Sequence, residues 1–191
     1  MDQNINEKAV KNIEEKNKIG QAALTLVKPE DAIIVASGST CTAFGRALDT
    51  NLPINVVTPS LGIAFLLNDN PNVNVMILGG RVYKKSLSVR GDYAAEGLNN
   101  VSCSKLFIGC DGIDTETGIT CATVEEAKLT NNMMAAATQT VVLADSSKFG
   151  RRGFGKICKL EDIDIIITDA GIPEAIQEEI EEAGVQIIIA E

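Results

Sequence analysis

Residues 32–40 read AIIVASGST, and the change of character within this stretch predicts the fold. The segment Ala32–Ala36 is rich in Ile and Val, as in a strand that is covered on both faces of a parallel sheet. Small polar residues follow it, and then Ala43, Phe44 and Ala47 recur with the spacing of an amphipathic helix. A buried strand, a short turn and a helix together form the repeating unit of α/β proteins.

The same alternation continues along the chain. Further apolar runs separated by helical segments are Asn55–Thr58, Val73–Leu78, Leu106–Gly109, Thr140–Ala144, Ile163–Thr168 and Gln186–Ala190. Strands that alternate with helices predict an open, doubly wound α/β fold, in which a mostly parallel sheet is flanked by helices in the Rossmann-like manner.

Two of the predicted helices begin with capping signals. Ser60 is expected to cap the helix Leu61–Leu67. Thr123 together with Glu126 fits a capping box, which predicts a helix from this point through Ala137.

The N-terminal residues differ in character from the rest of the chain. Residues 1–18 are polar and charged, and they are expected to form a linker or the remnant of an exposed helix. From Ile19 the pattern becomes amphipathic, so that residues 19–191 are expected to form one folded domain.

Composition argues against direct binding to nucleic acid or to a membrane. The net charge is -9, and the one local basic cluster lies between Lys148 and Lys156, so the chain lacks a broad basic surface that would release counterions from DNA. No stretch approaches the roughly 20 apolar residues of a membrane span. The N-terminus has neither the charge nor the apolar core of a secretory signal, which predicts a cytoplasmic location.

Cysteine and histidine usage predicts that the chain binds no metal or cofactor. The five cysteines show no C-x-x-C spacing, and the chain contains no histidine, so a structural zinc site of the usual kind is not expected. The cysteines are expected to be reduced and mostly buried. Any catalysis would depend on carboxylates and lysines, because histidine is the commonest general base.

The turn after the first strand is the first candidate site. Ser37, Gly38, Ser39 and Thr40 precede a helix, where small residues let the backbone approach an oxyanion and the helix dipole favours negative charge. No lysine follows as in a nucleotide P-loop, and the glycine spacing does not match a dinucleotide site. The phosphate of a small sugar fits better. An ordinary capped turn without a ligand is the alternative.

Polar or glycine residues follow four more of the predicted strands. In parallel sheets, ligands bind at the carboxyl ends of the strands near the topological switch point. The candidate residues at these ends are Thr58 and Ser60, then Gly79, Gly80 and Arg81, then Asp111 and Gly112, and finally Asp145 and Lys148.

Taken in order, these motifs resemble the C-terminal effector domain of DeoR-family bacterial transcription regulators. The resemblance covers about residues 18 to 170 and rests on Ser37–Thr40, Thr58–Leu61, Leu78–Arg81, Ser86–Ser88 with Gly91, Gly109–Asp114 and Leu143–Gly150. It implies a fold like that of ribose-5-phosphate isomerase. It also adds Gly91 and the acidic helix start at Glu125 to the expected ligand-binding residues.

The resemblance implies a sensor that binds a phosphorylated sugar or polyol and thereby controls DNA binding by a linked winged helix-turn-helix. That module normally precedes the sensor, and residues 1–18 are too short to contain it. The chain is therefore expected to be either part of a longer regulator or a stand-alone paralogue. It is also expected to form a homo-oligomer, because operator half-sites are read by symmetric pairs.

Two other functions stay open from the residues alone. An isomerase would use Asp111, Asp114, Glu125 or Glu126 together with Lys148 as acid, base and phosphate contact. A dimerisation module with a vestigial pocket is the other alternative. The sensor interpretation assigns no catalytic residue.

Several positions depart from the family pattern. Pro59 stands where the family usually has an asparagine, and Thr130 and Asn131 stand where it usually has Lys-Arg. Asp92 replaces a common proline. These changes predict either a ligand that differs from those of better-known members or a pocket with weakened anion binding.

Overall fold

The computed structural model describes residues 5–48 and 51–191 of the chain. Its centre is a seven-stranded sheet in the order β12-β11-β9-β6-β1-β2-β3, and every pairing in it is parallel. The strands are β1 (Ala32–Val35), β2 (Ile54–Thr58), β3 (Val73–Ile77), β6 (Cys103–Ile108), β9 (Ala137–Leu143), β11 (Ile165–Asp169) and β12 (Gln186–Ala190). All seven predicted runs are thus in one sheet, and the doubly wound α/β fold is confirmed.

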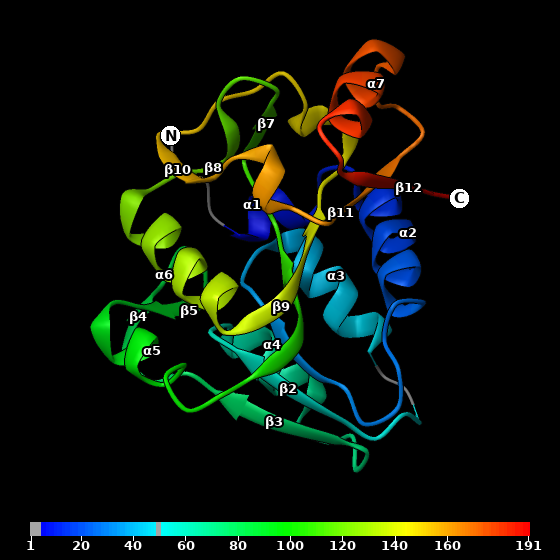
Figure 1. Ribbon diagram of the computed structural model, residues 1–191. Helices are drawn as coiled ribbons and strands as arrows, with labels where there is room; N and C mark the ends of the chain where they lie inside the picture. The colour runs from blue at the N-terminus through cyan, green and yellow to red at the C-terminus, as the bar shows by residue number, and fades with distance from the viewer. Residues whose placement is uncertain (1–4, 49–50) are drawn as a thin grey trace.

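Helices cover both faces of this sheet, as Figure 1 shows. Helices α2 and α3 pack together on one face, whereas α6 packs on the other face against β6 and β9. The helices are α1 (Ile5–Ala9), α2 (Ile13–Leu24), α3 (Ser39–Ala47), α4 (Leu61–Leu67), α5 (Asp92–Glu96), α6 (Val124–Ala135) and α7 (Glu174–Glu182). None of the helices in the described residues combines the length and apolar character that a membrane crossing requires.

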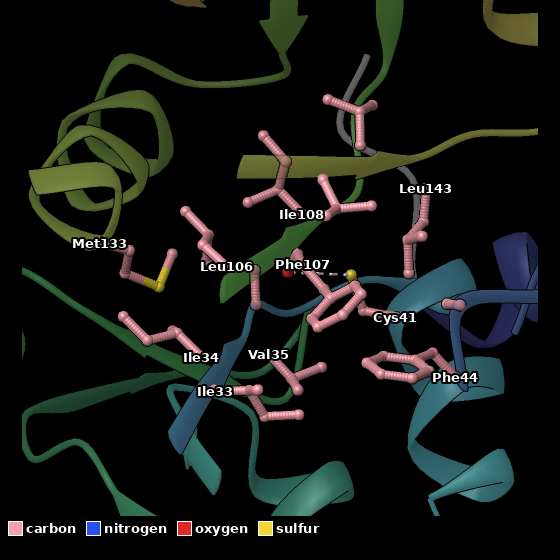
Figure 2. Packing of buried hydrophobic residues seen from close by; sticks show 14 of the residues in the cluster. Ile33, Ile34, Val35, Cys41, Phe44, Leu106, Phe107, Ile108, Met133 and Leu143 are labelled. Carbon is pink, nitrogen blue, oxygen red and sulfur yellow. Dashed lines mark hydrogen bonds between the residues drawn. The ribbon is translucent and has the colours of Figure 1, made fainter. Parts of the chain in front are cut away.

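Successive side chains of β6 point to opposite faces of the sheet, and each contributes to the hydrophobic core on its own face. Phe107 contacts Phe44 of α3, with ring centroids 4.4 Å apart. Figure 2 shows Leu106 on the opposite side of the strand, near Met133 of α6. All four side chains are buried, so successive residues of one strand anchor helices of opposite layers.

Two small antiparallel sheets were not predicted. One pairs β4 (Arg81–Tyr83) with β5 (Ser88–Arg90), and the other joins β10 (Gly155–Cys158), β8 (Gly118–Cys121) and β7 (Gly112–Asp114). These strands are three or four residues long. Such short segments carry too few alternations of polar and apolar residues for a pattern to be recognised.

The first long helix begins before the amphipathic pattern that starts at Ile19. Helix α2 begins at Ile13 rather than Ile19, so the boundary expected between residues 18 and 19 lies within it. A separate short helix, α1, precedes it, and Asn12 joins the two in a left-handed conformation with φ 51°. Lys16 is buried at this helix start. Because a lysine is usually exposed, the hydrophobic pattern of the sequence does not show a buried face there.

Both predicted helix caps are present. The Ser60 hydroxyl accepts a hydrogen bond from the Ile63 amide (3.3 Å), and the Thr123 hydroxyl accepts one from the Glu126 amide (3.2 Å). The predicted end of α6 at Ala137 is wrong, because Ala137 is the first residue of β9.

Three of the five cysteines are buried, and the other two are half-buried. No disulfide links them, in agreement with the expected reduced thiols. Burial raises the pKa of the Cys41 thiol to about 12, so this thiol stays protonated and unreactive.

Candidate functional site

A small pocket lies at the topological switch point of the sheet. Strands β1 and β6 are neighbours in the sheet. After β1 the chain adds β2 and β3 toward one edge of the sheet, and after β6 it adds β9, β11 and β12 toward the other edge. Loops that follow them therefore diverge and leave a crevice between them. The pocket has a volume of about 50 Å³ and is lined by Lys8, Ser37, Gly38, Ser39, Thr40, Gly109, Cys110, Asp111, Glu126 and Lys148.

The predicted anion cradle forms one wall of this pocket. Gly38 has φ 131° and ψ 161°, a conformation that is open to glycine but not to residues with a side chain. Its carbonyl accepts the amide (2.8 Å) and the hydroxyl (2.9 Å) of Thr42. Helix α3 begins at Ser39, so its first N–H groups have no acceptor within the helix. These groups and the helix dipole favour an anion.

Close backbone contact holds this helix in place. A Cβ atom on Gly20 of α2 would lie 2.9 Å from the carbonyl carbon and oxygen of Ala43, so α2 and α3 approach each other as closely as a glycine allows. On its other side α3 packs against β6 through Phe44 and Phe107. The amide groups of the cradle are therefore held rigidly relative to the end of β6.

Asp111 forms the opposite wall. Its backbone N–H donates to Thr120 O (2.9 Å), which fixes the residue after β6. Its Oδ1 accepts a hydrogen bond from Lys8 Nζ at 2.6 Å, and both side chains are about one quarter exposed. The partner of this carboxylate thus comes from the N-terminal segment, 103 residues away in the sequence.

Asp145 and Lys148 reach the same place from the end of β9. Asp145 is 1% exposed, and its Oδ1 accepts hydrogen bonds from the Ser147 amide, the Ser147 hydroxyl and Asn12 Nδ2. Burial by itself would raise the pKa of the Asp145 carboxyl, but these hydrogen bonds and the charge of Lys148 outweigh it and lower the pKa. Asp145 is therefore ionised at neutral pH.

A buried arginine next to the pocket was missed by sequence reasoning. Arg90 is 7% exposed, donates to Thr123 Oγ1 (2.9 Å) and Glu126 Oε2 (3.3 Å), and lies over the ring of Tyr83. Glu126 itself lines the pocket. The sequence signals were the position of Arg90 next to Gly91 and the capping pattern at Glu126, and neither indicates a long-range ion pair.

Of the predicted site residues, six line this pocket: Ser37, Gly38, Ser39, Thr40, Asp111 and Lys148. Asp145 does not line the pocket, but its charge interacts with that of Lys148, which does. Gly109, Cys110, Glu126 and Lys8 line it as well and were not among the predicted ligand-binding residues, although Glu126 was a candidate of the isomerase alternative.

The residues predicted at the ends of β2 and β3 lie elsewhere. Thr58 is fully buried, and its hydroxyl donates to Val35 O (2.7 Å), so it links β2 to β1. Ser60 caps α4. Residues Gly79, Gly80 and Arg81 are exposed between β3 and β4 and do not line the pocket.

The remaining predicted residues also lie outside the pocket. Gly91 is the N-cap of α5, and together with Glu125 it lines a separate surface cavity of about 170 Å³. Gly112 is buried, and a Cβ atom there would lie 2.2 Å from Arg151 O. Gly112 is thus required by close backbone packing beneath the pocket.

The positions that depart from the family pattern do not line the pocket either. Thr130 donates to Glu126 O (2.9 Å) and Asn131 donates to Ala127 O (3.1 Å), so both side chains bond to their own helix. In the described part of the chain, no group of three or more carboxylates and cysteines is placed to hold a metal ion.

Comparison with solved structures identifies the class of fold. The structure resembles ribose 5-phosphate isomerase A from Methanocaldococcus jannaschii with a TM-score of 0.54 at 20% sequence identity. The match covers 72% of this chain and 55% of the isomerase, so the chain spans about half of that enzyme. At this identity the likeness shows a shared fold and not a shared activity.

Sequence comparison identifies the family. The model of the DeoR C terminal sensor domain matches residues 11–170, and the chain belongs to this family. It is 33% identical to the HTH-type transcriptional regulator GolR of Listeria innocua, over 98% of this chain and 74% of that protein. It is also 33% identical to the HTH-type transcriptional repressor GlcR of Bacillus subtilis, over 93% of this chain and 68% of that protein. The chain is thus the ligand-sensing domain of a transcription regulator.

Proposed function

We propose that this domain binds a phosphorylated sugar or polyol in the switch-point pocket and thereby controls DNA binding by a linked helix-turn-helix. The observation that carries the proposal is the meeting of the α3 amide cradle with Lys148 across one pocket. The amides of Ser39 and Thr40 would bind the phosphate together with the lysine. The carboxylates of Asp111 and Asp145 would accept hydrogen bonds from the hydroxyl groups.

The relatives support the regulatory part of this proposal. The names of GolR and GlcR describe helix-turn-helix regulators, and this chain matches 74% and 68% of their lengths. We propose that the domain comprises residues 19–191 together with the N-terminal half of α2, and that it acts as a homo-oligomer, because regulators with paired half-sites are symmetric.

An isomerase is the second candidate, and one observation favours it. The fold matches ribose 5-phosphate isomerase, and the pocket places a carboxylate, Asp111, in the same small space as Lys148. The relatives named as regulators favour binding without turnover. Incubation with D-ribose 5-phosphate separates the two. If the wild type forms a ketose and Asp111→Asn does not, the domain is an enzyme and the sensor proposal is wrong.

A thermal-shift screen tests ligand binding. The compounds are pentose 5-phosphates, hexose 6-phosphates and glycerol 3-phosphate, each with its unphosphorylated counterpart. We expect at least one phosphorylated compound to raise the melting temperature, because a ligand that binds the folded state stabilises it. If none does so at millimolar concentration, the proposal is wrong.

Variants then locate the site. Lys148→Ala is expected to weaken binding at least about tenfold, because a hydrogen bond to a charged group is lost. Lys156→Ala removes the same charge from an exposed position in β10 and serves as the matched control. Equal loss of affinity in both variants would show a general charge effect and not a site at Lys148.

A further inference from the structure

The N-terminal segment Ile5–Lys16, here called the strap, contributes Lys8 to the lining of the pocket. It comprises α1, the turn at Asn12 and the start of α2, and α1 lies beside α3 in Figure 1. The hydrogen bonds that attach it to the rest of the domain include Ile5 N–H to Lys85 O (2.8 Å), Lys8 Nζ to Asp111 Oδ1 (2.6 Å), and Asn12 Nδ2 to Asp145 Oδ1 (2.9 Å) and Ser147 Oγ (3.4 Å).

Polar contacts attach the strap to the domain at Lys8 and Asn12, and further polar contacts hold the strap together internally. The ammonium of Lys16 is buried and donates to Lys8 O (2.5 Å) and Lys11 O (2.6 Å), which secures the end of α1. Burial lowers the pKa of Lys16, and the charge of Asp145 opposes this effect. By contrast, the apolar side chains of Val10 and Ile13 are 72% and 48% exposed. Polar contacts of this kind can be exchanged for contacts with a polar ligand at little net cost.

The strap also leaves too little room for a sugar. The closed pocket measures about 50 Å³, whereas pockets for small molecules usually measure roughly 300–1,000 Å³. Lys8 is one of the lining residues and occupies an oxygen of Asp111. A hydroxyl group that approaches this oxygen must displace the ammonium group. Outside the pocket lining, Asn12 shares Oδ1 of Asp145 with the amide and hydroxyl of Ser147.

From these observations we infer that the strap is an internal competitor of the ligand. Lys8 and Asn12 satisfy the two carboxylates when the pocket is empty, and a phosphorylated sugar displaces them when it binds. Release of the strap changes the path by which the chain enters the domain, so that pocket occupancy is transmitted to whatever precedes residue 5. The inference rests on the proposed function, because it requires a ligand with hydroxyl groups. Only a difference in affinity between the two states can drive such a change.

The first experiment needs no ligand. Amide hydrogen exchange of residues 5–12 is measured for the wild type, Lys8→Met and Lys18→Met. Lys18 is exposed in α2, so its variant removes the same charge away from the pocket. Lys8→Met is expected to raise the exchange rate about fivefold, as for the loss of a partly exposed ion pair, and Lys18→Met is expected to leave it unchanged. An unchanged rate in Lys8→Met overturns the inference.

The second experiment adds D-ribose 5-phosphate or, if it binds more tightly, another compound of the screen. The wild type is expected to exchange faster at residues 5–12 and more slowly at 37–42, and Lys8→Met is expected to bind about fivefold more tightly because no competitor remains. Weaker binding by Lys8→Met would make Lys8 a ligand contact and overturn the inference. If a compound binds without faster exchange at 5–12, the inference alone fails. If no compound binds either protein, the proposed function fails, and the inference fails with it.

Discussion

The two ends of the central sheet use the same residue type in opposite ways. At the amino ends, Asp31 accepts hydrogen bonds from Ser104 Oγ, Lys105 Nζ and the Lys28 amide, each at 2.9 Å. These partners lie on β6 or in the turn before β1, both of which belong to the folded frame. At the carboxyl ends, Asp111 accepts a hydrogen bond from Lys8 of the strap, and Asp145 accepts one from Asn12 of the strap in addition to those from Ser147.

This difference separates a structural carboxylate from a functional one. Fixed partners keep a buried charge satisfied permanently, which stabilises the domain but leaves nothing for a ligand. Partners on the strap satisfy the charge only until a ligand with a better hydrogen-bond donor displaces them. The comparison therefore predicts that substitutions in the folded frame, Asp31 included, change stability, and that substitution of a carboxylate that contacts the strap changes binding.

The largest expected effect concerns the backbone beneath the pocket. Gly112→Ala should lower the free energy of unfolding by about 3 kcal/mol, because its Cβ would lie 2.2 Å from Arg151 O and the loop would have to shift. Gly79→Ala is the control, since no atom lies within 4 Å of a Cβ there. Urea denaturation measures both. If Gly112→Ala and Gly79→Ala are equally stable, the loop around Gly112 can shift at no cost, and this result would contradict a fixed frame at the carboxyl ends.

The second prediction compares the two kinds of carboxylate directly. Asp31→Asn should cost about 2 kcal/mol of unfolding free energy, because a charged acceptor with several fixed donors is lost. Asp111→Asn should cost less than about 1 kcal/mol, as for a partly exposed ion pair, while abolishing ligand binding. Urea denaturation and ligand titration test the pair. The reverse order of stabilities would contradict the distinction between the two ends.

The third prediction concerns acid. Burial by itself would raise the pKa of Asp31, but hydrogen bonds from Lys105, Lys28 and Ser104 outweigh burial, so the pKa is lowered in the folded state. The stabilisation is thus complete above the unfolded pKa of about 3.9 and is lost as the pH falls through the lower folded pKa. The stability difference between wild type and Asp31→Asn should be constant above about pH 5 and shrink by about 1 kcal/mol or more toward pH 2. A difference that grows in acid would contradict the assigned sign.

The smallest effect is expected at the carboxyl end of β11. The hydroxyl of Thr168 is buried without a hydrogen-bond partner among the described residues. Thr168→Val should therefore raise the free energy of unfolding by about 1 kcal/mol, because a desolvated polar group is removed at nearly constant volume. Thermal denaturation checks the direction. A loss of stability would indicate that this hydroxyl is satisfied in solution.

The central sheet could be predicted because burial on both faces leaves a local mark. Each of its strands contains a run of apolar residues, which is uninterrupted in β1, and the turn at Gly38 carries its small residues within a few positions of β1. The contacts of Lys8 with Asp111 and of Asn12 with Asp145 could not be predicted, because they join residues 103 and 133 positions apart. Arg90 was missed for the same reason, since its partners lie on another element.

The sequence alone determined that the chain forms a parallel α/β sheet with a turn of small polar residues and a helix start after its first strand, because hydrophobic periodicity and helix-start chemistry are local properties. Only the tertiary structure decided which strand ends share a pocket. The order of the strands placed the ends of β1 and β6 together at the switch point and sent the end of β3 to the edge of the sheet. Strand order and the docking of the strap depend on contacts between distant residues, and these contacts form only when the whole chain is folded.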